Sequence, residues 1–225
     1  LLPKLSNLVI DKKYKDVSDS MSLTMRLMGI FIIPAAILFL LFGEEIAKVL
    51  YFGIPVDDAN YLGITLSAFA LGLIPVSIIL VLLRGLNAFE NLKSQVIGNF
   101  IMNLISVVLS LVAASYLEPE WVTVGLALIF TIHYFIGAGI SFILIKKHQV
   151  VIPVLSLVTF YLKLILIFAA AVMPIWFFRY STPGGNLIYL LLVLSSSAIF
   201  YLLLLKAFKI SEITTLIKVI KGRKE

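Results

Sequence analysis

The sequence predicts an all-α integral membrane protein that crosses the membrane six times and keeps both chain ends in the cytoplasm. The first observation is composition: of 225 residues, 61% are hydrophobic and 13% are charged, with a mean hydropathy of +1.11. A soluble domain is about 45–50% apolar and about 25% charged. This excess excludes a soluble enzyme, a DNA-binding domain and a secreted disulfide scaffold. The absence of cysteine also excludes thiolate chemistry and cysteine-based metal sites.

The second observation is six apolar stretches of membrane-spanning length. A helix needs about 20 apolar residues to cross a hydrocarbon core of about 30 Å. The stretches are 27–42 (extended at its start by 21–25), 61–83, 96–117, 121–145, 150–178 and 187–205. They lack the period-2 alternation of a membrane barrel, so helices are predicted.

The third observation is the placement of basic residues, which accumulate on the cytoplasmic side of membrane proteins. With the N-terminus inside, fifteen of the 18 Lys and Arg residues fall on that side. They are Lys4, Lys12, Lys13, Lys15, Arg26, Arg84, Lys93, Lys146, Lys147, Lys206, Lys209, Lys218, Lys221, Arg223 and Lys224. The outside segments carry only Lys48 and Arg179, together with six acidic residues. The bias predicts that both ends are cytoplasmic.

The spans and their flanks divide the chain into four parts. Residues 1–26 are predicted to form a cytoplasmic amphipathic elbow, and 209–225 a basic amphipathic tail on anionic lipids of the inner leaflet. Between them, 27–145 form a four-helix unit and 150–208 the last two helices. Neither flank has a base-reading motif, so no nucleic-acid partner is predicted. The chain begins without Met and is interpreted as the C-terminal part of a longer protein.

Within the spans, prolines and glycines interrupt the apolar pattern. Pro34, Pro75 and Pro174 each remove a backbone donor and tend to kink a helix, which indicates either ordinary bundle packing or hinges used in transport. Four glycines are predicted to be close helix contacts, as expected of small residues in membrane bundles. They are Gly63, Gly72, Gly137 and Gly139.

The sequence carries no catalytic set. It has no Gly-rich phosphate loop, no H-E-x-x-H and no G-x-S-x-G motif, so we predict neither an enzyme nor a cofactor nor a metal site. No carboxylate lies inside a predicted span, which argues against an autonomous proton or sodium carrier.

Four polar residues in or beside the spans are the candidates for a substrate path. Lys163 lies near the middle of the fifth span; it either faces a groove that receives an anionic head group or snorkels toward the cytoplasmic surface. Asn103 and His133 either join neighbouring helices or line a polar cavity. Arg84, paired in the pattern with Glu90, either anchors the inner end of the second span or contacts substrate.

Several short motifs resemble those of one transporter family. The segment Leu2-Pro3-Lys4-Leu5-Ser6 is similar to its "P-x-L-S", Pro34-Ala35-Ala36 to its "P-A-A", and Leu50-Tyr51-Phe52-Gly53 to its "L-F-x-x-G". Further along, Gly72 to Pro75 resembles "G-L-P", and Arg84-Gly85-Leu86-Asn87-Ala88-Phe89-Glu90 resembles "R-x-F-Y-A-L-x-D". Asn103 matches an Asn of the following span, and Gly125-Leu126-Ala127-Leu128 matches "G-L-A-L". These motifs are those of the MviN/MurJ lipid II flippases, within the multidrug/oligosaccharidyl-lipid/polysaccharide exporter superfamily.

The resemblance covers about residues 1–145, with departures at Asn87 and in the Glu90–Gln95 turn, which lacks the family's proline. It implies that the six spans correspond to spans nine to fourteen of a fourteen-span flippase in a bacterial plasma membrane. It also implies that the cationic cavity residues lie in an N-terminal lobe that this chain lacks. The last two spans would line a groove for the lipid tail and bring Lys163 close to a passing pyrophosphate.

The implied activity is alternating access by two lobes, which moves an undecaprenyl-linked peptidoglycan precursor from the inner to the outer leaflet. Two other interpretations stay open. One is an exporter of another polyprenyl-linked saccharide or of drugs, from the same superfamily. The other is a membrane scaffold that recruits cell-wall proteins and transports nothing.

Overall fold

The computed structural model describes residues 1–90, 92–177, 187–208, 210 and 212. Within these residues the chain is entirely helical apart from turns. Its helices are α1 (Leu2–Ile10), α2 (Tyr14–Leu50), α3 (Val56–Ala88), α4 (Leu92–Tyr116), α5 (Pro119–Lys147), α6 (Val154–Phe177) and α7 (Leu187–Ala207). Six of them, α2 to α7, are long and apolar enough to cross a membrane, which confirms the predicted number of spans. Most of the predicted 209–225 tail lies outside the described residues.

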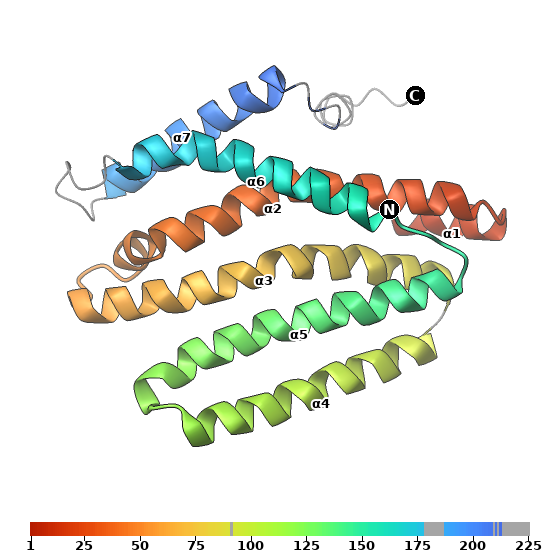
Figure 1. Cartoon of the computed structure of the whole chain (residues 1–225), viewed down its shortest axis with the longest axis horizontal. Coiled ribbons are helices and arrows are strands. Elements are labelled where there is room, and N and C mark those ends of the chain that lie inside the picture. Colours follow the sequence, from red (N-terminus) through yellow and green to blue (C-terminus); the bar gives the residue numbers. More distant parts are fainter. Residues whose placement is uncertain (91, 178–186, 209, 211, 213–225) are drawn as a thin grey trace.

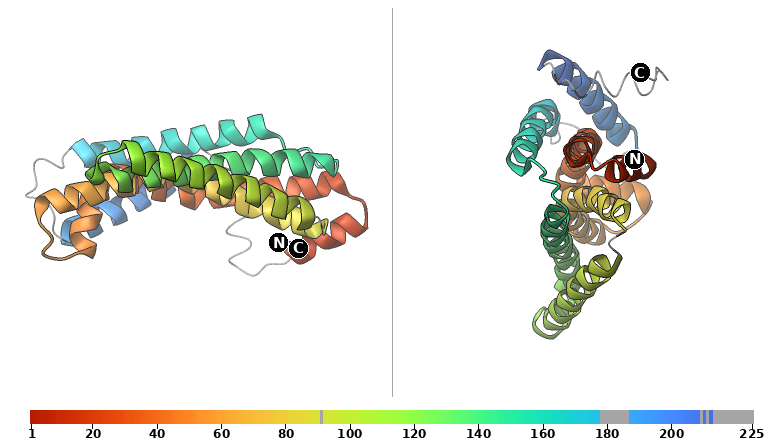
Figure 2. Two further views of the ribbon diagram at one scale, coloured as in Figure 1. Left: turned by 90° about the horizontal axis from the view of Figure 1, so that it is seen from below. Right: turned by 90° about the vertical axis from the view of Figure 1, so that its right-hand side faces the viewer.

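The six long helices lie side by side in a row whose order is α7, α6, α2, α3, α5, α4 (Figure 1). The most extensive interface joins α2 to α3, and the next joins α3 to α5. Viewed from the end, the row is curved, and α1 lies beside α2 and α3 (Figure 2). The main core fills the space between α2, α6 and their neighbours, with Met25, Ile33, Phe168 and Leu205 among its buried side chains. Helix α4 is at one edge and is the least buried of the six.

The helix that contains the first predicted span is longer than that span. Helix α2 begins at Tyr14, so residues 14–26 continue directly into the span, and only α1 and the turn at Lys12 precede it. No helix-breaking residue stands between Tyr14 and Met25, and Val17, Met21 and Met25 are fully buried, so packing supports this extension. The backbone leaves helical angles inside α2 at Phe42, where the predicted span ends.

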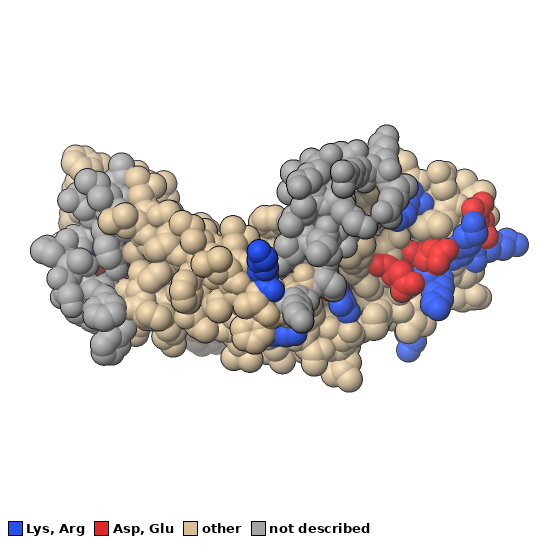
Figure 3. Space-filling model, turned by 90° about the horizontal axis from the view of Figure 1, so that it is seen from above, with Lys and Arg blue, Asp and Glu red and all other residues tan. Residues whose placement is uncertain are grey.

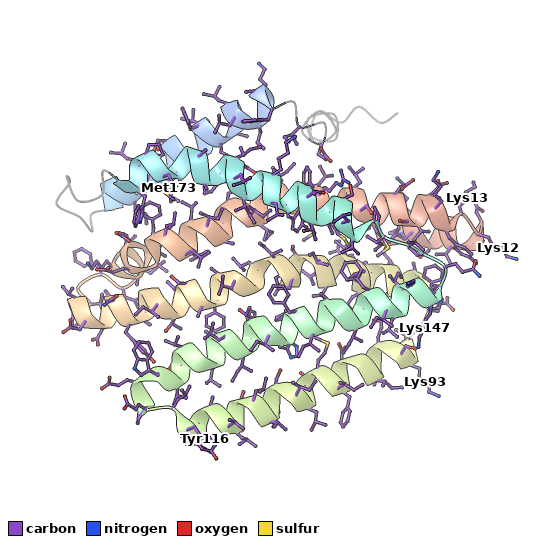
Figure 4. All side chains as sticks on the ribbon, viewed as in Figure 1. Lys12, Lys13, Lys93, Tyr116, Lys147 and Met173 are labelled. Atoms are coloured by element: carbon purple, nitrogen blue, oxygen red, sulfur yellow. The ribbon has the colours of Figure 1, made fainter. Side chains whose placement is uncertain are left out.

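Charged residues gather at the two ends of the row. Lys12, Lys13, Lys93 and Lys147 all lie at one end, here called the basic end, and Tyr116 lies at the opposite end (Figure 4). On the face seen from above, the basic end carries Asp and Glu as well as Lys and Arg, further Lys or Arg side chains lie in the middle of the molecule, and the remaining described surface is almost free of charge (Figure 3). The opposite end is acidic, because Asp57 and Asp58 begin α3 and Glu118 and Glu120 begin α5.

Three of the four predicted glycine contacts are present. A Cβ on Gly63 would lie 2.6 Å from the backbone N of Glu44, so α2 and α3 touch backbone to backbone there. Gly72 packs on Phe130, and Gly137 packs on Met102. The prediction for Gly139 is wrong: no heavy atom lies within 4 Å of the position of its Cβ, because this residue faces outward.

Candidate functional site

An apolar cavity lies between α2, α6 and α7, and we call it the groove. Its volume is about 240 Å³. Its lining residues are Ile30, Phe31, Pro34, Leu38, Phe168, Leu194, Ala198, Tyr201 and Leu202. All are apolar except for the Tyr201 hydroxyl, which points into the protein. The groove therefore matches a hydrocarbon chain better than a polar ligand.

A proline shapes one wall of the groove. Pro34 has no N–H, so the carbonyl of Ile30, four residues earlier, loses its partner within α2. The Tyr201 hydroxyl of α7 donates to this carbonyl over 3.1 Å. Tyr201 is 5% exposed, and its ring packs edge-on against Phe168 of α6. Because of the proline, the Ile30 carbonyl is available to accept a hydrogen bond from α7. We call this hydrogen bond, which attaches α7 to α2 beside the groove, the proline docking point.

A second tyrosine ties α6 to the same helix. The Tyr161 hydroxyl donates to the Met25 carbonyl over 2.8 Å, more than a turn before Ile30. Gly29 leaves room for this ring, because a Cβ on Gly29 would lie 2.7 Å from Cε1 of Tyr161. Both of the last two helices are therefore attached to the backbone of α2 by tyrosine hydroxyls.

Two cations lie on the basic side of the groove. Lys163 is exposed on α6, five residues before Phe168, and it is absent from the ion pairs among the described residues. Arg26 is one turn before Ile30 on α2, and its guanidinium lies 5.3 Å from the centre of the Phe160 ring. It also pairs with Glu212 at 2.9 Å. In the sequence Arg26 was counted only as an inside charge, and no sequence signal indicates its contacts with α6 and Glu212.

The other candidates lie elsewhere. His133 on α5 is 2.6 Å from the Ser106 hydroxyl of α4, measured at Nδ1, so it joins these two helices. Asn103 is exposed on α4, one turn from Ser106. Arg84 is exposed at the basic end and makes no ion pair with Glu90 in the described structure. Since α2, α3 and α5 separate α4 from α6, the structure does not bring these residues together with Lys163.

A wider cavity of about 600 Å³ lies at the acidic end, between the starts of α3 and α5. It is lined by Asp57, Asp58, Tyr61, Pro119 and Glu120. Its charge would repel a phosphate. Among the described residues, no three His, Asp or Glu side chains gather closely enough to hold a metal ion.

Comparison with known families shows which family the chain belongs to. The family model described as "Lipid II flippase MurJ" matches residues 1–196. The chain belongs to the MurJ family. No curated protein matches the chain. The match extends past the region of the motifs into α7, so the groove lies largely within the matched part.

MurJ membership and six apolar helices make this chain a multi-pass membrane protein of a bacterial lipid II flippase family, which serves peptidoglycan biosynthesis. The family is one of transporters. Several MurJ motif positions prove to be packing positions here. Ser6 donates to the Leu2 carbonyl in α1, Ala88 and Pro75 are buried, and a Cβ on Gly125 would lie 2.5 Å from Cδ1 of Leu117. Pro3 lies in the first turn of α1 and is exposed.

Gly72 is the motif position with the clearest structural reason. A Cβ there would lie 3.0 Å from the Phe130 ring and 3.0 Å from the Thr131 hydroxyl. That hydroxyl donates to the Ala68 carbonyl of α3 over 3.0 Å in a buried setting. The small residue thus lets α3 and α5 approach until a side chain of one can bond the backbone of the other.

Proposed function

We propose that this chain moves undecaprenyl-linked peptidoglycan precursor (lipid II) from the inner to the outer leaflet by alternating access. The observation that carries the proposal is the groove between α2, α6 and α7, which is apolar along its length and has Lys163 on its basic side. Polyprenyl phosphates combine a long hydrocarbon with a compact anion. The apolar groove matches the hydrocarbon, and Lys163 beside it matches the anion. The tail lies in the groove, and the pyrophosphate passes Lys163.

The orientation that we propose has the basic end in the cytoplasm, with both ends of the chain inside. Its support is the distribution of charge: Lys12, Lys93 and Lys147 lie at one end of the row, whereas the other end carries Asp57, Asp58, Glu118 and Glu120. In this orientation the 209–225 segment meets anionic inner-leaflet lipids.

The six helices then correspond to spans nine to fourteen of the family. The predicted part 27–145, which holds most of α2 and of α3 to α5, belongs to one transport lobe, and an N-terminal lobe of the same protein completes the cavity. The substrate enters this arrangement from the side of the predicted part 150–208, which contains α6 and α7.

Depletion of the gene product that contains this chain tests the function. We expect lipid II to accumulate inside and to disappear from the outer leaflet of intact cells, as read by an impermeant reagent that attacks outer-leaflet lipid II. Unchanged lipid II at the outer surface contradicts the proposal. Accumulation of a different lipid-linked saccharide would instead identify another substrate of the same superfamily, and unchanged lipids with lost cell-wall protein recruitment would identify a scaffold.

The role of Lys163 is tested by Lys163→Ala in the same gene product. A Lys near mid-membrane costs about 2.5–3.5 kcal/mol to insert, so its removal should not destabilise the fold. We expect lipid II transport to fall about tenfold and Lys163→Arg to restore most of it. Lys93→Ala, which removes an exposed Lys of the basic end away from the groove, is the matched control and should leave transport unchanged. Full transport by Lys163→Ala excludes this residue from the path.

The orientation is tested with single cysteines, since the 225 residues contain none. We expect an impermeant maleimide to label Glu118→Cys in intact cells and to label Lys93→Cys only after the cells are opened. The reverse pattern would invert the proposed topology. The unsubstituted protein serves as the control for background labelling.

A further inference from the structure

Arg26 is the centre of a polar cluster built from three separate segments. Its Nη1 donates to Oε1 of Glu212 over 2.9 Å, and its Nη2 donates to the Ser156 hydroxyl over 2.7 Å. Its guanidinium also lies 5.3 Å from the centre of the Phe160 ring. Arg26 belongs to α2, Ser156 and Phe160 to α6, and Glu212 to the segment after α7. The Arg26 and Glu212 side chains are 26% and 8% exposed, so the pair is largely shielded from solvent.

The cluster stands at the basic end of the groove. On α2, Arg26 precedes the lining residue Ile30 by four positions, which is about one helical turn. On α6, Phe160 precedes Lys163 by three positions, so the two side chains are neighbours on the helix surface. Arg26 therefore lies over the Phe160 ring, and Lys163 is exposed on α6 about one turn further from the basic end. An anion entering the groove from the basic end meets Arg26 first and Lys163 about one turn deeper.

Glu212 is placed where such an anion would bind. It is 7% exposed, although it lies beyond α7, and the nearby Ile210 is packed in the main core. A guanidinium offers the same fork of N–H donors to a carboxylate and to a phosphate, so the two anions compete for one position.

We propose that Arg26 is an exchangeable anion site, occupied by the Glu212 carboxylate when the groove is empty and by the phosphate of a polyprenyl lipid when it is filled. This inference rests on the proposed function and adds to it the first residue that the head group meets. The exchange is feasible because a buried ion pair gains little net free energy: the cost of desolvating both charges nearly cancels their attraction. A phosphate brings more charge and more acceptor oxygens than a carboxylate, and Lys163 stands one turn further to receive it.

The test measures lipid binding by the complete gene product in nanodiscs of phosphatidylcholine. The probes are undecaprenyl phosphate and uncharged undecaprenol, which share one tail. We expect Glu212→Gln to tighten binding of undecaprenyl phosphate about tenfold, equivalent to ~1.4 kcal/mol of coupling, and to leave binding of undecaprenol unchanged. We expect Arg26→Gln to weaken binding of the phosphate until it equals that of the alcohol.

Asp11→Asn is the matched control, because Asp11 pairs with Lys13 in an exposed ion pair at the same end, with side chains 54% and 56% exposed. It removes the same charge and should change neither affinity. Unchanged or weakened binding of the phosphate in Glu212→Gln overturns the inference, as does an Arg26→Gln variant that binds like the unsubstituted protein. Should Arg26→Gln fail to fold, Glu212→Gln decides alone, since Gln keeps the shape of Glu.

The two proposals fail in different ways. If the unsubstituted protein binds neither lipid, the groove is not a polyprenyl site and the proposed function fails with it. If it binds both lipids and the variants at Arg26 and Glu212 change nothing, the groove stands and only the exchange is wrong. Binding of the phosphate that is lost in Lys163→Ala but kept in Arg26→Gln would likewise place the anion at Lys163 alone.

Discussion

The two sides of the central helices hold their neighbours in different ways. On one side, α3 meets α5 through small residues: Gly72 packs on Phe130, and the Thr131 hydroxyl reaches the Ala68 carbonyl. On the other side, α6 and α7 reach α2 through the long side chains of Tyr161 and Tyr201. The groove lies on that second side, between the tyrosine attachments and the core.

This contrast separates the closely packed α3–α5 interface from the α2–α6–α7 side, where a cavity can hold a ligand. Small residues let helices approach until backbone and side chain touch, and such contacts stabilise the bundle through close packing. On the other side, the rings of Tyr161 and Tyr201 reach the backbone of α2, and the cavity of the groove lies beside Tyr201. Transport by rocking of one unit against another needs both kinds of region, and here each lies on its own side of α2 and α3.

The largest expected effect is at the backbone contact of α2 with α3. Gly63→Val would place a branched side chain where the Cβ alone is 2.6 Å from the Glu44 nitrogen. Because backbone cannot move aside cheaply, we expect a loss of ~3 kcal/mol, measured as a lower midpoint of thermal unfolding of the solubilised protein. Gly139→Val is the matched control: its Cβ meets open space, so the midpoint should hardly change. Equal effects in the two variants would contradict the close contact.

A smaller effect is expected at the proline docking point, and it can be isolated by a double-mutant cycle. Tyr201→Phe removes the donor to the Ile30 carbonyl, which should cost ~1 kcal/mol in the unfolding free energy. Pro34→Ala returns an N–H to position 34, and this donor can bond the same carbonyl within α2. Tyr201→Phe should therefore cost less in the Pro34→Ala background.

The double-mutant cycle also tests whether α7 is attached to α2 by a hydrogen bond that depends on Pro34. If the cost of Tyr201→Phe is equal in both backgrounds, the proline does not create the docking point, and α7 is held by packing alone. Tyr161→Phe serves as the control, because its acceptor, the Met25 carbonyl, does not depend on Pro34, so its cost should be the same in both backgrounds.

Properties that depend on local sequence were predicted well. The six spans and the separation of basic from acidic ends follow from hydropathy and charge, which are read residue by residue. Helix α2 begins at Tyr14, before the predicted span, and the burial of Val17 in this extension could not be predicted from hydropathy alone. Glycine spacing marked Gly63, Gly72 and Gly137 as contacts, but it does not say which face meets a neighbour, so Gly139 was wrong.

The Arg26 cluster was beyond the reach of sequence. Arg26 and Glu212 are 186 residues apart, and nothing in either segment indicates the other. The same is true of the tyrosines, because aromatic residues in a span are ordinary and their acceptors are backbone carbonyls that every residue has. Contacts of this kind are decided by the tertiary fold, whereas helices in a membrane are decided by composition.

The smallest expected effect is at the α4 edge, where His133 was a substrate-path candidate. The structure pairs its Nδ1 with the Ser106 hydroxyl at 2.6 Å, and hydrogen bonds between membrane helices contribute ~0.6 kcal/mol on average. We expect His133→Ala and Ser106→Ala to lower the unfolding free energy by about this amount each, with most of it shared in the double variant. Lipid II transport should be unchanged in all three, because α2, α3 and α5 separate α4 from the groove. A His133→Ala variant that keeps its stability but loses transport would place α4 on the substrate path. It would also contradict the distinction between a structural α3–α5–α4 side and a substrate-binding α2–α6–α7 side.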